Sequence, residues 1–179
     1  MTASYFISDL HLADERPDST ETLLRFLNDI APSAQRLFIL GDLFEYWIGD
    51  EALDSPMPAQ VAGALRELGS RGTSVSFLHG NRDFLLGERF SSEAGLQLLP
   101  DPYKLVLHGV PTLLMHGDTL CTDDVEYLKF RHIVRNPDWQ TEFLAKPIPE
   151  RIQLAQAARS ESEQAKKGKS MTSWMCPTV

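Results

Sequence analysis

Short apolar runs, each followed by a polar cluster, set the pattern of the first two thirds of the chain. The runs are SYFIS (4–8), RLFIL (36–40), SVSFL (74–78) and TLLM (112–115), and they lead into DLH, GDLFE, HGNRD and HGD. Their length and their content of β-branched, aromatic and leucine residues predict buried strands. The segment 104–116 predicts a hairpin that turns near Gly109, so one part of the sheet is expected to be antiparallel.

Apolar residues at helical spacing lie between these runs. They recur in 18–30 and in 59–69, which ends at glycines. Asp18 with Glu21 three residues later predicts an N-cap and its partner. Strands alternating with helices predict an α/β fold with a largely parallel core.

The pattern of apolar and polar residues changes from about residue 125. The segments 125–135 and 148–167 predict helices with Lys or Arg beside apolar residues, and prolines break the stretch between them. We therefore expect three parts: a core over 1–124, a helical cap over 125–170 and a tail over 171–179.

Composition narrows the range of functions. The chain has 179 residues, 42% of them apolar, which suits one domain with a substantial core. A net charge of −8 argues against a nucleic-acid binder with a basic face. Residues 1–124 carry 8 Lys and Arg against 19 Asp and Glu, whereas residues 125–179 carry 9 against 6. This predicts an acidic part that holds cations and a basic part that meets an anionic ligand or membrane surface.

Cysteine content and the N-terminal sequence bear on the compartment. Cys121 and Cys176 make no disulfide framework, and MTASYFISDL lacks the pattern of a signal peptide. No apolar run has the length that spans a bilayer. We expect an intracellular chain, soluble or peripheral to a membrane, and a monomer.

The polar clusters carry the candidate chemistry. In an open α/β sheet, ligands bind beyond the carboxyl ends of the strands, where this chain places Asp9, His11, Asp42, Asn81 and His116. Residues two apart on an extended chain point to the same side, so Asp9 and His11 are expected to enter one site together. Oxygen and imidazole ligands without thiolates suit Mn²⁺, Fe²⁺ or Zn²⁺. A carboxylate such as Asp42 can bridge two cations that serve phosphoryl transfer.

Each motif alone also has a structural interpretation. Asp-x-His is common, GDLFE suits a turn and a helix cap, GN suits a turn, and a single histidine is more often hydrogen-bonded than a ligand. Their order, each after a strand, favours the metal site. His79, His108 and His132 lack such support and are interpreted as structural or surface residues, and Glu45 is expected to orient the site rather than bind metal.

The motifs resemble those of the calcineurin-like metallophosphoesterases. The fuller strings ILGDLFEYWIGD, HGNRDFLLG and LLMHGDTLCTDD are similar to those of the UDP-2,3-diacylglucosamine hydrolases of lipid A biosynthesis, from about residue 4 to about residue 170. The resemblance implies a sandwich of mixed β-sheets flanked by helices, with a helical cap insertion. Most metallophosphoesterases have His after the Asn of GN, whereas Arg82 stands here. A guanidinium can offset transition-state charge but is a poor proton donor; the alternative is a surface arginine.

The resemblance also implies roles for particular residues. The implied metal ligands are Asp9, His11, Asp42, Asn81 and His116, and the implied catalytic group is Asp42, Asn81, Arg82 and His116. The implied substrate contacts are Asn81, Arg82, Asp124, Ser162, Lys166 and Lys169. The last three lie in a basic segment whose alternative interpretation is a solvated charged face, and Lys166 stands where another polar residue is expected.

The implied reaction is hydrolysis of a nucleotide-linked glycolipid with two Mn²⁺ per chain. Water attacks the α-phosphorus of UDP-2,3-diacylglucosamine and gives UMP and 2,3-diacylglucosamine 1-phosphate, at the cytoplasmic face of the bacterial inner membrane. Apolar cap residues could sheath the acyl chains or pack the cap onto the core. A helix face both basic and apolar suits peripheral attachment.

The sequence departs from the family at its C-terminal end. It lacks the family's Gly-His-x-His block, and MTSWMCPTV after Ser170 resembles no part of the family. We therefore expect a C-terminally truncated fold, a weakened second metal site and an exposed sheet edge. Two other functions stay open: a metallophosphoesterase of another substrate, such as a nucleotidase or phosphodiesterase, and an inactive fragment or binding scaffold.

Overall fold

The computed structural model describes the backbone of residues 3–168 and the side chains of residues 3–160. The chain forms two compact units, Met1–Asp118 and Thr119 onward. The expected division into a core over 1–124 and a cap over 125–170 stays a prediction.

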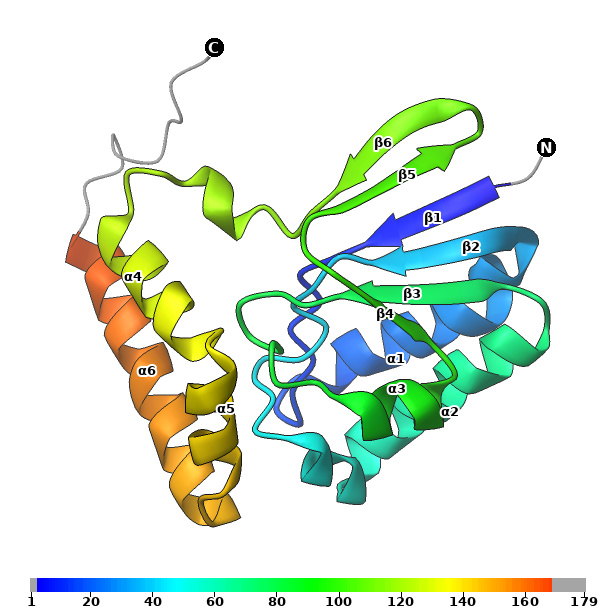
Figure 1. Ribbon diagram of the computed structural model, residues 1–179. Coiled ribbons are helices and arrows are strands. Elements are labelled where there is room, and N and C mark those ends of the chain that lie inside the picture. The colour runs from blue at the N-terminus through cyan, green and yellow to red at the C-terminus, as the bar shows by residue number, and fades with distance from the viewer. Residues whose placement is uncertain (1–2, 169–179) are drawn as a thin grey trace. The chain divides into compact units, whose positions relative to one another are not determined.

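A four-stranded parallel sheet forms the centre of the first unit (Figure 1). Its strands, in spatial order, are β1 (Ala3–Ile7), β2 (Ala34–Ile39), β3 (Ser74–Leu78) and β4 (Gln97–Leu99). The helices that connect them are α1 (Pro17–Arg25), α2 (Pro56–Ser70) and α3 (Glu88–Ala94). The π-helical segment η1 (Phe26–Ile30) continues from α1, and the short 3₁₀ helices are η2 (Ala31–Ser33) and η3 (Asp50–Asp54). The predicted α/β fold with a parallel core is confirmed.

The expected hairpin forms a separate two-stranded antiparallel sheet. It consists of β5 (Tyr103–Leu107) and β6 (Val110–Leu114), and it turns at His108 and Gly109, which both have positive φ. Leu114 of β6 is buried together with Phe38, Leu78 and Leu99 of the parallel sheet. The hairpin thus closes an apolar layer and brings the end of β6 to the parallel strands.

The predicted start of the first helix is wrong. The helix α1 begins at Pro17 and its N-cap is Arg16. Among the described side chains none caps it, and Asp18 lies in the first turn instead. Proline is favoured at the first helical position because it has no N–H to satisfy and its φ is already helical. That preference decides the boundary here.

Asp50 caps α3 from a distant part of the chain. Its Oδ1 accepts hydrogen bonds from Trp47 Nε1 at 3.1 Å and Gly87 N at 2.9 Å. Its Oδ2 accepts from Arg89 N at 2.9 Å and Phe90 N at 3.2 Å. These bonds satisfy N–H groups that a helix start leaves without intrahelical partners. The sequence pattern missed both this cap and the seven-residue helix that it starts.

The second unit is helical over its described part. After η4 (Asp118–Leu120) it contains α4 (Val125–Val134), α5 (Pro137–Leu144) and α6 (Ile148–Gly168). Pro137, which the sequence pattern treats as a break, instead occupies the start of α5, where Asn136 Oδ1 accepts from Asp138 N at 2.7 Å. In the part of the chain that the structure describes, no helix is long and apolar enough to cross a membrane.

Candidate metal centre

The loops that follow β1 and β2 run side by side at the carboxyl end of the sheet. Asp9 N donates to Gly41 O at 3.1 Å, and His11 N donates to Asp42 O at 3.0 Å. The parallel pairing therefore continues past the strands into the loops that carry the candidate ligands. This pairing is the local reason why the two loops stay together.

Asp9 and His11 do not lie on extended chain, so the predicted reason for their convergence is wrong. Asp9 has φ 56° and His11 has φ 49°, and β1 ends before them at Ile7. Asp42 has φ 54°. Asp and His enter the left-handed region several times more often than most residues, yet each case costs energy that the surroundings must offset. The side chains converge through these local bends rather than through strand alternation.

Five side chains from four loops meet at this edge of the sheet. Ligand-type atoms of Asp9, Asp42 and His116 all lie within 4.8 Å of one another. His11 Nε2 lies 4.0 Å from Asp9 Oδ1 and 3.8 Å from Asp42 Oδ2. Asn81 Oδ1 lies 3.1 Å from His116 Nε2, which in turn lies 3.7 Å from Asp42 Oδ1. The structure thus brings together Asp9, His11, Asp42, Asn81 and His116; their roles as ligands remain a proposal.

The hydrogen bonds of His116 test whether the cluster suits a cation. His116 Nδ1 lies 2.8 Å from Leu40 O, and because a carbonyl only accepts, Nδ1 carries the proton. In a neutral ring, Nε2 then presents a lone pair to two oxygens, Asn81 Oδ1 and Asp42 Oδ1. Converging lone pairs without a proton between them fit a bound cation, and a backbone carbonyl is a common partner for the other nitrogen of a metal-binding histidine.

Burial of two neighbouring carboxylates gives a second indication. Burial raises the pKa of Asp42, opposed by the N–H of Arg82 at 2.9 Å and by His116 and His11. Burial, and next the charge of Asp42, raise the pKa of Asp83 to about 6. Burial and mutual repulsion make the two negative charges unfavourable, and a divalent cation at Asp42 would offset both effects. The charge distribution therefore suits a divalent cation.

Asp83 holds the backbone on which Asp42 stands. Its Oδ1 accepts from Gly80 N at 2.9 Å and Asp42 N at 3.2 Å, and its Oδ2 accepts from Leu43 N at 2.7 Å. Asp83 is fully buried. Sequence analysis missed this role, because two of the three donors lie about 40 residues away in the chain; the sequence offers only the general tendency of Asp to accept from nearby backbone N–H groups.

The remaining implied substrate contacts belong to the second unit or to residues outside the described part, and three histidines were interpreted as structural or surface residues. Asp124 caps α4 through a hydrogen bond from Tyr127 N at 3.3 Å. Ser162 and Lys166 fall in α6 beyond the described side chains, and Lys169 and the 171–179 tail lie outside the described residues. His79 Nε2 lies 2.7 Å from Leu86 O, His108 Nε2 lies 3.4 Å from Ser4 Oγ, and His132 is exposed.

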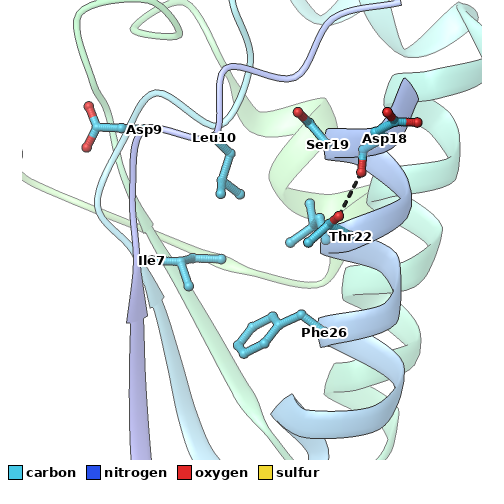
Figure 2. Close-up of a pocket in the computed structure, with 8 residues that line it drawn as sticks. Ile7, Asp9, Leu10, Asp18, Ser19, Thr22 and Phe26 are labelled. Atoms are coloured by element: carbon cyan, nitrogen blue, oxygen red, sulfur yellow. Dashed lines mark hydrogen bonds between the residues drawn. The ribbon is translucent and has the colours of Figure 1, made fainter. Parts of the chain in front are cut away.

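A pocket of about 480 Å³ lies between the end of β1 and α1 (Figure 2). It is lined by Ile7, Asp9, Leu10, Asp18, Ser19, Thr22, Leu23 and Phe26. Figure 2 shows Ile7 directed toward the helix and Leu10 directed down into the space between the strand and the helix, whereas the Asp9 carboxylate is directed away from the helix. The polar bond drawn there, from Thr22 Oγ1 to Asp18 O at 2.8 Å, belongs to the helix itself. The pocket is therefore a mainly apolar space beside the candidate metal centre and is not the centre itself.

Comparison with known proteins shows the family of the chain. It is 54% identical over 160 residues to a UDP-2,3-diacylglucosamine hydrolase of Stenotrophomonas maltophilia (strain K279a), covering 88% of this chain and 63% of the relative. It is 51% identical over 167 residues to that of Marinobacter nauticus, with 93% and 68% covered, and 47% identical over 170 residues to that of Haemophilus influenzae (strain PittGG), with 95% and 71% covered. The chain belongs to the UDP-2,3-diacylglucosamine hydrolase family.

The match does not extend over the whole of the relatives. The chain spans about two thirds of their length, from 63% to 71% in these three cases. No family model matches the chain. Among solved structures, the crystal structure of Pseudomonas putida nuclease MPE has a TM-score of 0.43 and 21% identity, covering 56% of this chain and 48% of that one.

Proposed function

We propose that the chain hydrolyses the pyrophosphate bond of UDP-2,3-diacylglucosamine with two Mn²⁺ ions. The observation that carries this proposal is the convergence of Asp9, Asp42 and His116 in a member of this family. Water attacks the α-phosphorus, and the bond from this phosphorus to the bridging oxygen breaks. The products are UMP and 2,3-diacylglucosamine 1-phosphate.

The proposed ligands of the ions are Asp9, His11, Asp42, Asn81 and His116. Bound Mn²⁺ would lower the pKa of water and polarise phosphoryl oxygens. Asp42 is the proposed bridge because it is buried and its two oxygens face different histidines: Oδ2 faces His11 and Oδ1 faces His116. Asn81 is the proposed link between ions and substrate, since its side chain already contacts His116.

Arg82 is the proposed phosphate contact. Its side chain is 18% exposed, and within the described side chains its Nε is buried without a hydrogen-bond partner. A half-buried guanidinium suits a phosphate oxygen, because the fork of N–H groups matches phosphate geometry and its charge is permanent. Arg82 would offset negative charge that develops as the bond breaks.

Exposed apolar and basic side chains of the second unit support two parts of the proposal: binding of the acyl chains of the substrate and peripheral attachment to the inner-membrane surface. Exposed apolar side chains there include Phe130, Ile133, Leu144, Ile148 and Leu154. Basic residues accompany them on α4, among them Lys129. Such a mixture suits a diacylated, anionic ligand or an anionic leaflet. Asp124, Ser162, Lys166 and Lys169 stay proposed substrate contacts.

The test is release of UMP from UDP-2,3-diacylglucosamine by the purified chain with Mn²⁺, beside turnover of a nitrophenyl phosphodiester. The Asp42→Ala variant is the negative control, and Asp29→Ala, at an exposed position outside the cluster, is the matched control. UMP release that Asp42→Ala abolishes and Asp29→Ala preserves supports the proposal. Preference for the small diester would indicate a phosphoesterase of another substrate. A chain that retains no Mn²⁺ after dialysis and has no turnover would indicate an inactive fragment or binding scaffold.

A further inference from the structure

The carboxylate of Glu45 lies among three cationic or ionisable side chains. Glu45 Oε2 lies 3.5 Å from His11 Nδ1 and 3.6 Å from Arg16 Nη2, and Oε1 lies 3.6 Å from Arg82 Nη1. The residue is 8% exposed. A charge this far from water acts on its neighbours with little screening.

The position of Glu45 relative to the His11 ring has a chemical consequence. Within the described side chains, Nδ1 of His11 is buried and makes no hydrogen bond, and the Glu45 carboxylate is 3.5 Å away. Carboxylates lie beside both ring nitrogens, but Glu45 is the nearest: 3.5 Å from Nδ1, against 3.8 Å from Asp42 and 4.0 Å from Asp9 to Nε2. The nearest carboxylate favours the tautomer that carries the proton on Nδ1. The lone pair then lies on Nε2, which faces Asp9 and Asp42.

The backbone of His11 is held as well as its ring. Its N–H donates to Asp42 O at 3.0 Å, and the guanidinium of Arg16 donates to its carbonyl oxygen. Arg16 also lies 3.6 Å from the Glu45 carboxylate. Glu45 is therefore next to the guanidinium that holds the carbonyl of His11, whose φ is positive. Ring and backbone of His11 therefore both depend on the region around Glu45.

We propose that Glu45 is a positioning residue that fixes the tautomer and orientation of His11 with one oxygen and the guanidinium of Arg82 with the other. It thereby couples the geometry of the cation site to the group proposed to meet the phosphate. The proposal rests on the metal and phosphate roles proposed above for His11 and Arg82, but on neither the lipid nor the nucleotide of the substrate.

The first measurement reads the tautomer in the metal-free chain. Histidine-selective ¹⁵N correlation spectra at pH 8 distinguish Nδ1–H from Nε2–H, and a His11→Gln variant assigns the signal. We expect Nδ1–H for His11 in the unaltered chain and a shift toward Nε2–H in Glu45→Gln. Nε2–H in the unaltered chain overturns the proposal, and this result does not depend on whether the variant folds.

The second measurement is Mn²⁺ affinity by calorimetry. Loss of a residue that orients a metal-binding histidine typically weakens affinity about 10–100-fold, and we expect this for Glu45→Gln. Glu45→Asp keeps the charge on a shorter side chain and should lie between the two. Glu67→Gln is the matched control, because Glu67 is an exposed glutamate of α2 that pairs with Arg71 just after the helix. Equal affinity of Glu45→Gln and Glu67→Gln overturns the proposal.

Failure of the proposed substrate would look different. The tautomer and the Mn²⁺ affinity are read without UDP-2,3-diacylglucosamine, so absence of UMP release leaves both results standing. Where the chain does turn over substrate, Glu45→Gln should lower kcat through displaced Arg82, with Glu45→Asp restoring part of it. A change confined to KM would mean that Glu45 does not act through Arg82 in the reaction.

Discussion

Gly80 and Asp42 are in such close contact that no other residue fits at position 80. A Cβ on Gly80 would lie 2.1 Å from Asp42 Oδ1 and 2.4 Å from Asp42 N. A Cβ on Gly41 would likewise lie 2.5 Å from Gly80 Cα and 2.8 Å from His116 Nδ1. The loops after β2 and β3 therefore approach one another through glycines, and this approach places Asp42 beside His116.

Gly80→Ala should displace Asp42. Because the clash is with backbone as well as side-chain atoms, we expect at least about 10-fold weaker Mn²⁺ binding and a loss of about 1–3 kcal/mol in the free energy of unfolding. Calorimetry and urea denaturation measure the two effects. The control is Gly63→Ala on α2, where a Cβ meets nothing within 4 Å, and where alanine should stabilise by about 0.5–1 kcal/mol. Unchanged Mn²⁺ affinity in Gly80→Ala would contradict the importance of this contact.

Asp42→Asn should separate cation binding from folding. Asparagine tolerates positive φ, and its Oδ1 can still accept from Arg82 N. The negative charge that raises the pKa of Asp83 is removed. We expect Mn²⁺ binding to be lost while the metal-free chain becomes more stable by on the order of 1 kcal/mol. Urea denaturation with a chelator, beside a Mn²⁺ titration, checks both signs. A metal-free variant less stable than the parent chain would show that the Asp42 charge is already well compensated.

Asp50→Ala should destabilise the first unit without touching the candidate metal centre. It removes the acceptor of four hydrogen bonds, three from the start of α3 and one from the Trp47 indole. We expect a loss of about 2–3 kcal/mol in the free energy of unfolding, read by urea denaturation, and a changed Trp47 fluorescence.

Asp54→Ala is the matched control for that experiment. Asp54 pairs with Arg89 at 2.7 Å, but the two side chains are 69% and 45% exposed. Exposed pairs contribute about 0–1 kcal/mol, so this variant should unfold nearly as the parent chain does. Equal losses in both variants would refute a special role for Asp50.

Arg82→Ala should lower kcat for the proposed reaction about 10²–10³-fold, because one set of donors to the transition state is lost. Steady-state kinetics of UMP release measure it. Mn²⁺ affinity should stay within a small factor of that of the parent chain, since the Arg82 side chain is not among the proposed ligands. A change confined to KM would mean that Arg82 only binds the ground state.

Much of the candidate site could be predicted from the sequence, because strand ends are marked locally. Apolar runs followed by Asp9, Asp42, Asn81 and His116 located the cluster, since parallel strands deliver their ends to one edge. The hairpin that brings His116 was marked by its glycine turn. These features depend on residues that are neighbours in the chain.

The supporting residues could not be predicted because they act over distance. Asp50 caps a helix that begins 38 residues further on, and Arg16 donates to a carbonyl five residues earlier. The route of convergence at Asp9 and His11 was also wrong, since a strand pattern gives no sign of two positive φ angles just beyond the strand. The helices α4 and α6 were predicted with nearly their observed bounds, but α5 was missed because proline was taken as a break rather than a start.

Asp9, His11 and Asp42 have left-handed backbone, which lowers the thermal stability of the chain, yet their side chains are proposed to bind the cations. Stability and cation binding therefore favour different residues at these three positions. Glycine would relax the chain at each of them and would delete a proposed ligand each time. Selection for thermal stability alone would therefore favour substitutions at these positions and would remove the proposed metal ligands. A laboratory lineage evolved at rising temperature without Mn²⁺ should accumulate changes there sooner than at the buried apolar positions beneath them.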